Sequence, residues 1–256
     1  MSRIKELFDS KQQNILNVYF TAGFPALDST IEIMKSLQDN GVDLIELGIP
    51  YSDPLADGPV IQESSIVALN NGMTVKKLFQ QLESMRKEVH VPVVLMGYMN
   101  TVLQYGFEDF CIEAKRCGID GLILPDLPVY EFENKYQAII KGHGLDFIFL
   151  VTPETSEQRV RKLDELSSGF LYAVSSSSTT GNNKDFADVS AYLKRLTSYQ
   201  LKNPVLVGFG ISDKRSFESV LPYSNGGIIG SAFIKAISAT SDLKQSISTF
   251  IKGILN

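Results

Sequence analysis

The sequence predicts a closed barrel of eight parallel β-strands with helices around it, a (β/α)8 TIM barrel, formed as a single domain over residues 1–256 with extra helices. Short apolar runs alternate with longer amphipathic segments, and the runs recur about every 25 residues. The runs are apolar along their whole length, as in strands covered on both faces. About eight such units suit a closed barrel, and 256 residues is an ordinary length for one. An open doubly wound sheet is the structural alternative.

The first strand is expected at 15–23. The segment 28–41 after it is typical of a helix, with Asp28 or Ser29 as its cap and Gly41 as its stop. Further helices are expected at 74–89, 107–118 and 157–169, with extra helices at 3–10 and within 59–90. The other strands are expected at 42–48, 91–98, 119–126, 145–151, 169–175, 203–210 and 226–230.

The composition argues against several classes of function. The net charge is −5, so no basic excess attracts nucleic acid. The N-terminus carries charges throughout, unlike a signal peptide, and no apolar run is long enough to cross a bilayer. We therefore expect a cytoplasmic protein with a small-molecule substrate.

The residues that commonly bind metals are badly spaced for that task. Cys111 and Cys117 lie in one helical stretch, at a spacing that suits neither a disulfide framework nor a metal knuckle. His90 precedes a strand, His143 ends a helix, and neither has partners at metal-ligand spacing. We expect a reducing compartment and no metal.

Glu46 is an acid within the apolar run 42–48. It shares one face of the strand with Leu44 and Gly48, because successive side chains alternate between faces. If that face is turned to the barrel axis, Glu46 lies in a partly dry mouth, where burial raises its pKa and suits it to acid–base work. The alternatives are a pair with Lys or Arg, or a side chain turned to solvent.

Asp53 and Asp57 follow in the loop "YSDPLADGP", which three prolines stiffen. Asp-Pro and Asp-Gly-Pro are common in turns, and Asp57 is also placed to cap a helix that starts near Pro59. The functional alternative is that the stiff loop holds a carboxylate near Glu46.

Glycines follow the last two strands, where a barrel often binds phosphate. Unpaired backbone N–H groups at a helix N-terminus attract anions. The sequence therefore predicts a phosphate pocket, which "TTG" at 179–181 could complete; the alternative is that these glycines only turn the chain. The residues after strands seven and eight that carry this prediction are Gly208, Gly210, Gly230 and Ser231.

Aromatic residues also lie at or near strand ends. Core packing explains most such residues, but a ring of them at the mouth would suit a flat apolar substrate. They are Tyr19, Phe20, Phe24, Tyr172 and Phe209.

The stretch "ELGIPYSDPLADGPVIQ" closely resembles the signature of the tryptophan synthase α chain family. The resemblance covers nearly the whole chain: it extends to "YFTAGFP", "GLILPDLPVYE", "VGFGISD" and "GGIIGSAFIK". It implies a (β/α)8 barrel that cleaves indole-3-glycerol phosphate to indole and glyceraldehyde 3-phosphate.

The resemblance also implies roles for individual residues. Glu46 matches the general acid/base, and Asp57 matches the carboxylate that holds the indole N–H. Tyr19 and Phe209 match aromatics on either side of the indole, Tyr172 a tyrosine at its edge, and Thr180 a loop hydroxyl that orients the catalytic Asp. The phosphate binders match Gly181, Gly208, Gly210, Gly230 and Ser231.

A partner is implied as well. The family works in an α2β2 complex with a β chain that carries pyridoxal phosphate, and the α chain itself holds no cofactor. Asp53 matches the loop that contacts β, and the loops "YSDPLADGP" and "SSSSTTGNNK" match mobile lids. Two departures are the serines at 175–178, where the family has a bulky residue and a glycine, and Phe24, where Asp is frequent.

Two other functions remain open from the sequence. One is a different phosphate-binding barrel, such as a sugar-phosphate isomerase of histidine synthesis, although the half-barrel repeat of that class is not visible here. The other is a non-catalytic α-type chain that mainly activates the β chain.

Overall fold

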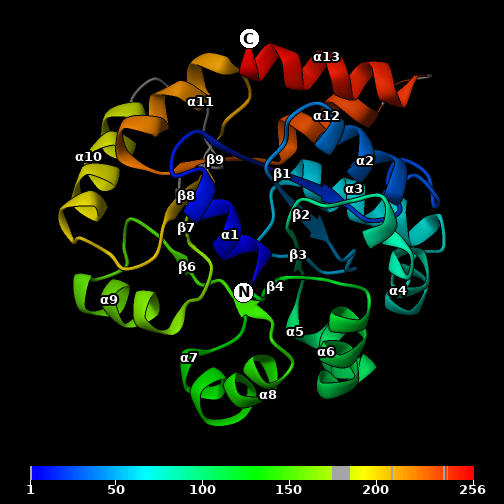
Figure 1. Cartoon of the computed structure of the whole chain (residues 1–256), viewed down its shortest axis with the longest axis horizontal. Helices are drawn as coiled ribbons and strands as arrows, with labels where there is room; N and C mark the ends of the chain where they lie inside the picture. Colours follow the sequence, from blue (N-terminus) through cyan, green and yellow to red (C-terminus); the bar gives the residue numbers. More distant parts are fainter. Residues whose placement is uncertain (1, 175–184, 209, 239, 241) are drawn as a thin grey trace.

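The computed structural model describes residues 2–174, 185–208, 210–238, 240 and 242–256. All its strands are parallel and form one sheet in the order β5-β4-β3-β2-β1-β9-β8-β7-β6, with helices arranged around it (Figure 1). The expected strands are confirmed with shorter bounds. They are β1 Ile15–Thr21, β2 Leu44–Gly48, β3 Val93–Met96, β4 Gly121–Ile123, β5 Asp146–Phe147, β6 Leu150–Val151, β7 Leu171–Val174, β8 Val205–Gly208 and β9 Gly226–Ile229.

β5 and β6 are two parts of one expected strand, and together they close the barrel. β5 pairs with β4 and β6 pairs with β7, so the single segment 146–151 joins the two ends of the sheet. The two residues between them continue the ladder: the Ile148 amide donates to the Leu122 carbonyl at 3.0 Å, and the Tyr172 amide donates to the Phe149 carbonyl at 3.0 Å. The closed barrel is therefore confirmed, and the open doubly wound sheet is excluded.

The expected helices between the strands are present, and so are the extra helices at the N-terminus and after β2. Ser29 occupies the cap position of the helix after β1, as expected, but its side chain makes no capping hydrogen bond: its hydroxyl donates to the carbonyls of Phe24 and Ala26. The helices are α1 Arg3–Ser10, α2 Thr30–Asp39, α3 Pro59–Asn70, α4 Val75–Leu82, α5 Met99–Tyr105, α6 Phe107–Arg116, α7 Val129–Glu131, α8 Gln137–Gly142, α9 Glu157–Leu166, α10 Asp185–Ser198, α11 Lys214–Val220, α12 Ser231–Ser238 and α13 Leu243–Leu255.

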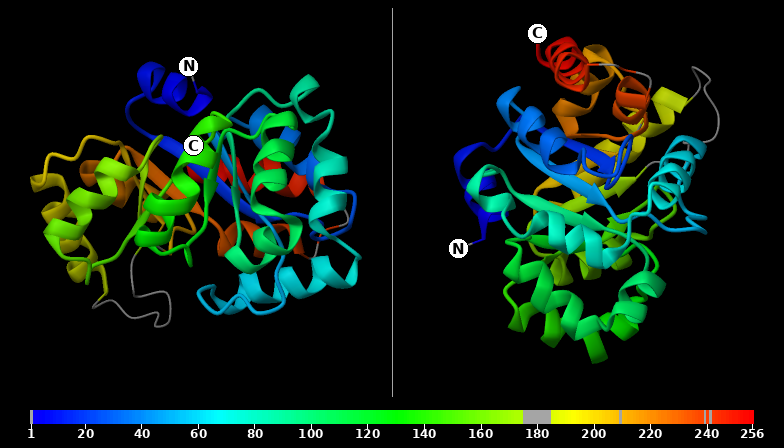
Figure 2. Two further views of the ribbon diagram at one scale, coloured as in Figure 1. Left: turned by 90° about the horizontal axis from the view of Figure 1, so that it is seen from below. Right: turned by 90° about the vertical axis from the view of Figure 1, so that its right-hand side faces the viewer.

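Two apolar clusters fill the molecule. The larger lies between the sheet and the surrounding helices. The smaller fills the barrel interior and includes Ile4 and Phe8 of α1, so α1 closes the end of the barrel at which the strands begin. Figure 2 shows α1 and α3 on opposite sides of the barrel. α3 therefore lies near the end where the strands finish, together with the loops that follow the strands.

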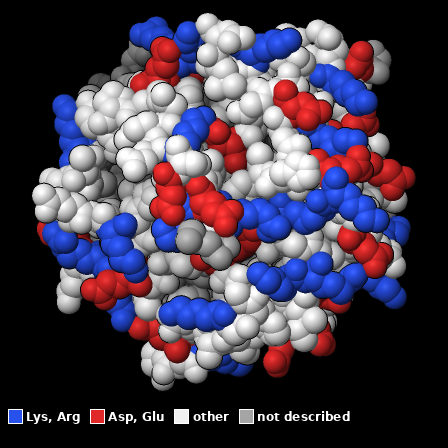
Figure 3. Space-filling model, in the orientation of Figure 1, with Lys and Arg blue, Asp and Glu red and all other residues white. Residues whose placement is uncertain are grey.

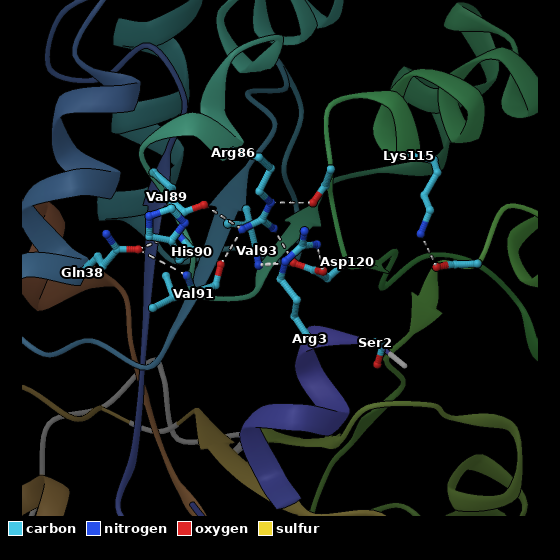
Figure 4. A network of polar contacts seen from close by, with 12 residues as sticks. Ser2, Arg3, Gln38, Arg86, Val89, His90, Val91, Val93, Lys115 and Asp120 are labelled. Carbon is cyan, nitrogen blue, oxygen red and sulfur yellow. Dashed lines mark hydrogen bonds and ion pairs between the residues drawn. The ribbon is translucent and has the colours of Figure 1, made fainter. Parts of the chain in front are cut away.

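α1 is fastened to the barrel by charged groups (Figure 4). Asp120 precedes β4, and its side chain is 4% exposed. Its carboxylate accepts from Arg3 at 2.9 Å, from the Val93 amide at 2.8 Å and from Arg86. His90 lies beside this network, at the end of the barrel where the strands begin.

Acidic and basic side chains are interspersed on the face that carries α1 (Figure 3). Among the described residues, none of the helices has the length and apolar character needed to cross a membrane.

Candidate active site

Glu46 lies inside the barrel. Leu44, two residues earlier on β2, belongs to the interior cluster, and Glu46 itself is 0% exposed. The Nδ2 of Asn17 on β1 donates to Glu46 Oε2 at 3.1 Å. Glu46 Oε1 has no hydrogen-bond partner among the described residues. The predicted inward orientation is confirmed. Both alternatives are wrong for the described chain: Glu46 does not pair with a Lys or Arg, and its side chain does not face solvent.

The environment of Glu46 favours its neutral form. Burial raises its pKa to about 8, the hydrogen bond from Asn17 opposes that rise, and the charge of Asp57 adds to it. A carboxyl group with a pKa near neutrality exchanges its proton readily at physiological pH, which is what a general acid–base catalyst requires.

Asp57 is a second carboxyl group at the mouth. The Tyr98 hydroxyl, at the end of β3, donates to Asp57 Oδ2 at 3.1 Å. Burial raises the pKa of Asp57 to about 6, while the hydrogen bond from Tyr98 opposes the rise. Asp57 is not the cap of α3: the cap position is Gly58, without a side-chain hydrogen bond. The capping alternative is therefore wrong, and the functional interpretation of Asp57 stays a prediction.

Asp53 lies on the outer side of the same loop. Its side chain is exposed, and its Oδ2 accepts from Ser52 Oγ at 2.5 Å. Its neighbour Leu55 is 90% exposed, the most exposed of the large apolar side chains described. This part of the loop is turned to solvent, whereas Asp57 is turned to the barrel.

Two tyrosines lie beside the carboxyl groups. Tyr19 pairs in register with Glu46, and its hydroxyl covers Gly48 so closely that a Cβ there would lie 2.2 Å from it. Tyr172 covers Gly208 in the same way, at 2.4 Å. Burial raises the pKa of Tyr172, and the nearby charges of Glu46 and Asp57 raise it further. Both rings thus lie against the acid pair.

The other described aromatics pack elsewhere. Phe20 is fully buried and meets Phe233 edge-to-face at 6.4 Å between ring centroids. Phe24 is 5% exposed and belongs to the cluster between sheet and helices. Core packing explains these two residues.

The predicted phosphate residues lie after β8 and β9. Gly210 has a φ of +40°, which favours glycine, and among the described residues a Cβ there would meet nothing within 4 Å. Ser231 is exposed and begins α12, directly after Gly230. Gly208 has a different reason to be glycine, since the Tyr172 ring occupies the space of a side chain. Three other predicted residues, Thr180, Gly181 and Phe209, lie outside the described residues.

Sequence reasoning missed Asn17 and Tyr98, although both left a signal. Asn17 interrupts the apolar run "ILNVYF" as Glu46 interrupts its own, and Tyr98 follows a strand, where barrel sites form. Within the described ranges no cluster of three acidic, His or Cys side chains is arranged to hold a metal.

Two carboxyl groups of raised pKa at the mouth of a closed (β/α)8 barrel, together with glycine turns after β8 and β9, are typical of a barrel enzyme. The comparison with protein families narrows this class. The family model of the tryptophan synthase alpha chain matches residues 6–252. The chain belongs to that family.

Its relatives cover it from end to end. The tryptophan synthase alpha chain of Phocaeicola vulgatus is 47% identical over 258 residues, which is 100% of both chains. That of Flavobacterium johnsoniae is 50% identical over 245 residues, 95% of this chain and 96% of the relative.

Solved structures agree with the fold. Subunit alpha of tryptophan synthase from Legionella pneumophila has a TM-score of 0.90 at 32% identity, and the match covers 99% of this chain and 97% of that one. Tryptophan synthase from M. tuberculosis, in an aminoacrylate-bound form, contains a chain with a TM-score of 0.86 at 31% identity. The match covers 99% of this chain and 100% of that one.

Proposed function

We propose that this chain is the α subunit of tryptophan synthase and that, as a single catalytic domain, it cleaves indole-3-glycerol phosphate to indole and glyceraldehyde 3-phosphate. The observation that carries the proposal is the pair of carboxyl groups at the mouth. Glu46 is fully buried, and one of its oxygens has no hydrogen-bond partner among the described residues, whereas Asp57 accepts from Tyr98 and is only partly buried.

The reaction is a retro-aldol cleavage. The bond between indole C3 and the first side-chain carbon breaks, and its electrons need an acceptor. Protonation of C3 turns the ring into that acceptor, with positive charge at the ring nitrogen. The side-chain hydroxyl gives up its proton and becomes the aldehyde, so one proton is gained and one is lost.

The two carboxyl groups divide this work. With a pKa of about 8, Glu46 is present in both protonation states near neutral pH and can exchange protons with the reacting groups. With a pKa of about 6, Asp57 is mostly ionised at pH 7 and stabilises the positive charge at the indole N–H. Tyr19, Tyr172 and Phe209 would hold the flat ring.

The phosphate would bind opposite the acids, on the loops after β7, β8 and β9. Gly210 would approach the phosphate with its backbone, and the first N–H groups of α12, at Ser231, would attract the anion. Gly181, Gly208 and Gly230 would complete this cradle, with Thr180 orienting Asp57.

The β chain is the proposed partner, in an α2β2 complex in which β carries pyridoxal phosphate and this chain carries no cofactor. The outer part of the loop 49–58 supports this, because it presents Asp53 and the highly exposed Leu55 to solvent. A biosynthetic enzyme of this kind would work in the cytoplasm.

Incubation with indole-3-glycerol phosphate, with and without a β chain, tests the activity through release of indole. Glu46→Gln should lower turnover by about 100-fold to 10,000-fold while the phosphate end still binds substrate. Glu63→Gln makes the same change on the exposed face of α3 and should leave turnover unchanged. No indole with or without β would contradict the proposal in favour of a chain that only activates β.

A further inference from the structure

Asn17 is an amide inside an apolar barrel. The interior cluster is made of Ile, Leu, Val and Phe side chains, and the register partners of Asn17 are Leu44 on β2 and Ile228 on β9. Asn17 is 0% exposed. Its Nδ2 donates to Glu46, while its Oδ1 has no hydrogen-bond partner among the described residues. Because such a buried amide costs free energy and an apolar side chain would pack at least as well, we look for a role of Asn17 in its contact with Glu46.

We propose that Asn17 is a positioning residue for the reaction: it binds Glu46 Oε2 and thereby leaves Oε1 as the oxygen that exchanges the proton. This rests on the proposed function. The Asn17 Nδ2–Glu46 Oε2 distance is 3.1 Å, and Oε1 has no partner among the described residues. Because Oε2 already accepts an N–H, a proton that Glu46 gains is better placed on Oε1.

The same contact also explains how Glu46 can lose its proton in so dry a place. The amide N–H stabilises the ionised carboxylate, which opposes the effect of burial. The described groups that act electrostatically with Glu46 are Asp57 of the loop, Tyr19 of β1 and Tyr172 of β7. None of these three carries a positive charge, so the described partner that favours ionised Glu46 is Asn17.

The test uses Asn17→Leu, which keeps the approximate volume and removes the N–H. The pKa of Glu46 should rise by about one pH unit, since a hydrogen bond to a charged group has about that strength. The limb of the pH profile of kcat/KM that Glu46 governs should move up by the same amount. Infrared titration of the protonated carboxyl band measures the pKa of Glu46 directly, with Glu46→Gln identifying the band.

Ile15→Val is the matched control. Ile15 lies on the same strand and the same inward face, at the end away from the loops, and the change leaves the Asn17–Glu46 contact intact. It should lower stability slightly without moving either the pH profile or the carboxyl band.

Asn17→Asp is the second variant, nearly identical in shape, in case Asn17→Leu does not fold. Two carboxyl groups at this distance cannot both ionise easily, so the pair should titrate in two separated steps. A double variant gives one more readout: once Glu46 is Gln, adding Asn17→Leu should change the residual turnover less than twofold, because Asn17 acts through Glu46.

An equal loss of activity at every pH, with the carboxyl band unmoved, would show that Asn17 only fills space and would overturn the proposal. The infrared titration requires no substrate, so it decides the Asn17–Glu46 coupling even if indole-3-glycerol phosphate is not cleaved. Absence of cleavage in the wild type would refute the proposed function instead.

Discussion

Glu46 and Asp57 are carboxyl groups of one site in unequal surroundings. Glu46 is held by an amide in an apolar interior, and Asp57 by a phenol at the edge of solvent. The resulting pKa values, about 8 and about 6, keep one group mostly neutral and the other mostly ionised at pH 7. Separate environments allow two residues of the same chemistry to perform different tasks.

The raised pKa of Glu46 has a cost in stability that depends on pH. The folded protein keeps this proton up to about pH 8, whereas the unfolded chain loses it near pH 4.5. Between these values the folded state binds more protons, so stability falls as pH rises. The free energy of unfolding of Glu46→Gln, relative to that of the wild type, should therefore increase by roughly 2–4 kcal/mol between pH 4.5 and pH 8. Urea unfolding at several pH values measures this, and a constant difference would contradict it.

Tyr98→Phe tests the support of Asp57. Without the hydroxyl, Asp57 loses a donor to its ionised form, so its pKa should rise from about 6 by up to about one pH unit. We expect kcat/KM to fall about threefold to tenfold at pH 6 and much less at pH 8. Tyr51→Phe is the control: Tyr51 stacks on Tyr98 at 5.2 Å between ring centroids, and within the described chain its hydroxyl accepts from Asn100 and not from a group that contacts Asp57. A loss independent of pH would leave only a packing role.

At the scale of elements, the loop 49–58 is braced from β3 and α5. Tyr98 accepts from the Ala56 amide at 3.2 Å as well as donating to Asp57, and its ring stacks on Tyr51. The inner side of the loop is thereby fixed to the barrel, while the outer side, with Asp53, faces solvent. One short loop can thus serve the acid pair and present a surface to a partner.

Asp120, which precedes β4, attaches α1 and β3 to that strand. Asp120→Ala should destabilise the protein by about 3 kcal/mol, because it leaves the largely buried Arg86 without its carboxylate. Arg3→Ala removes the other ion pair, but Arg3 is 44% exposed, so the loss should stay below about 1 kcal/mol. Denaturant unfolding compares the two variants. Equal losses would mean that burial of Arg86 does not matter.

The positions of the strands could be predicted from the sequence, because strands that are buried on both faces appear as continuous apolar runs. The sequence also identified Glu46, since a charge in such a run needs a reason. It could not show that Tyr172 lies over Gly208 or that Tyr98 reaches Asp57. Those contacts join residues far apart in the chain, and only barrel closure brings them together. Gly208 is an example: its place in the sequence predicted an anion site, whereas the fold shows a second, steric reason for a glycine there, because the Tyr172 ring occupies the space of a side chain.

At the scale of the whole molecule, the two ends of the barrel have different tasks. The end where the strands finish carries the acid pair and the glycine loops, as in other barrels of this class. The other end is closed by α1, whose Ile4 and Phe8 enter the interior cluster. Phe8 meets Phe170 at 6.3 Å between ring centroids. Stability and chemistry are therefore largely separated along the barrel axis.

That separation predicts that Phe8→Ala destabilises the protein without altering its chemistry. Phe8 is 7% exposed, and removal of a buried phenyl ring costs about 3–5 kcal/mol. The pH profile of kcat/KM should keep its shape at temperatures where the variant is folded, because Glu46 and Asp57 lie at the other end. Ile112→Ala, on α6 and 44% exposed, is the control and should cost less than about 1 kcal/mol. A Phe8→Ala variant that unfolds as late as the wild type would mean that α1 is not needed to close the barrel, whereas a shifted pH profile would mean that the two ends are coupled.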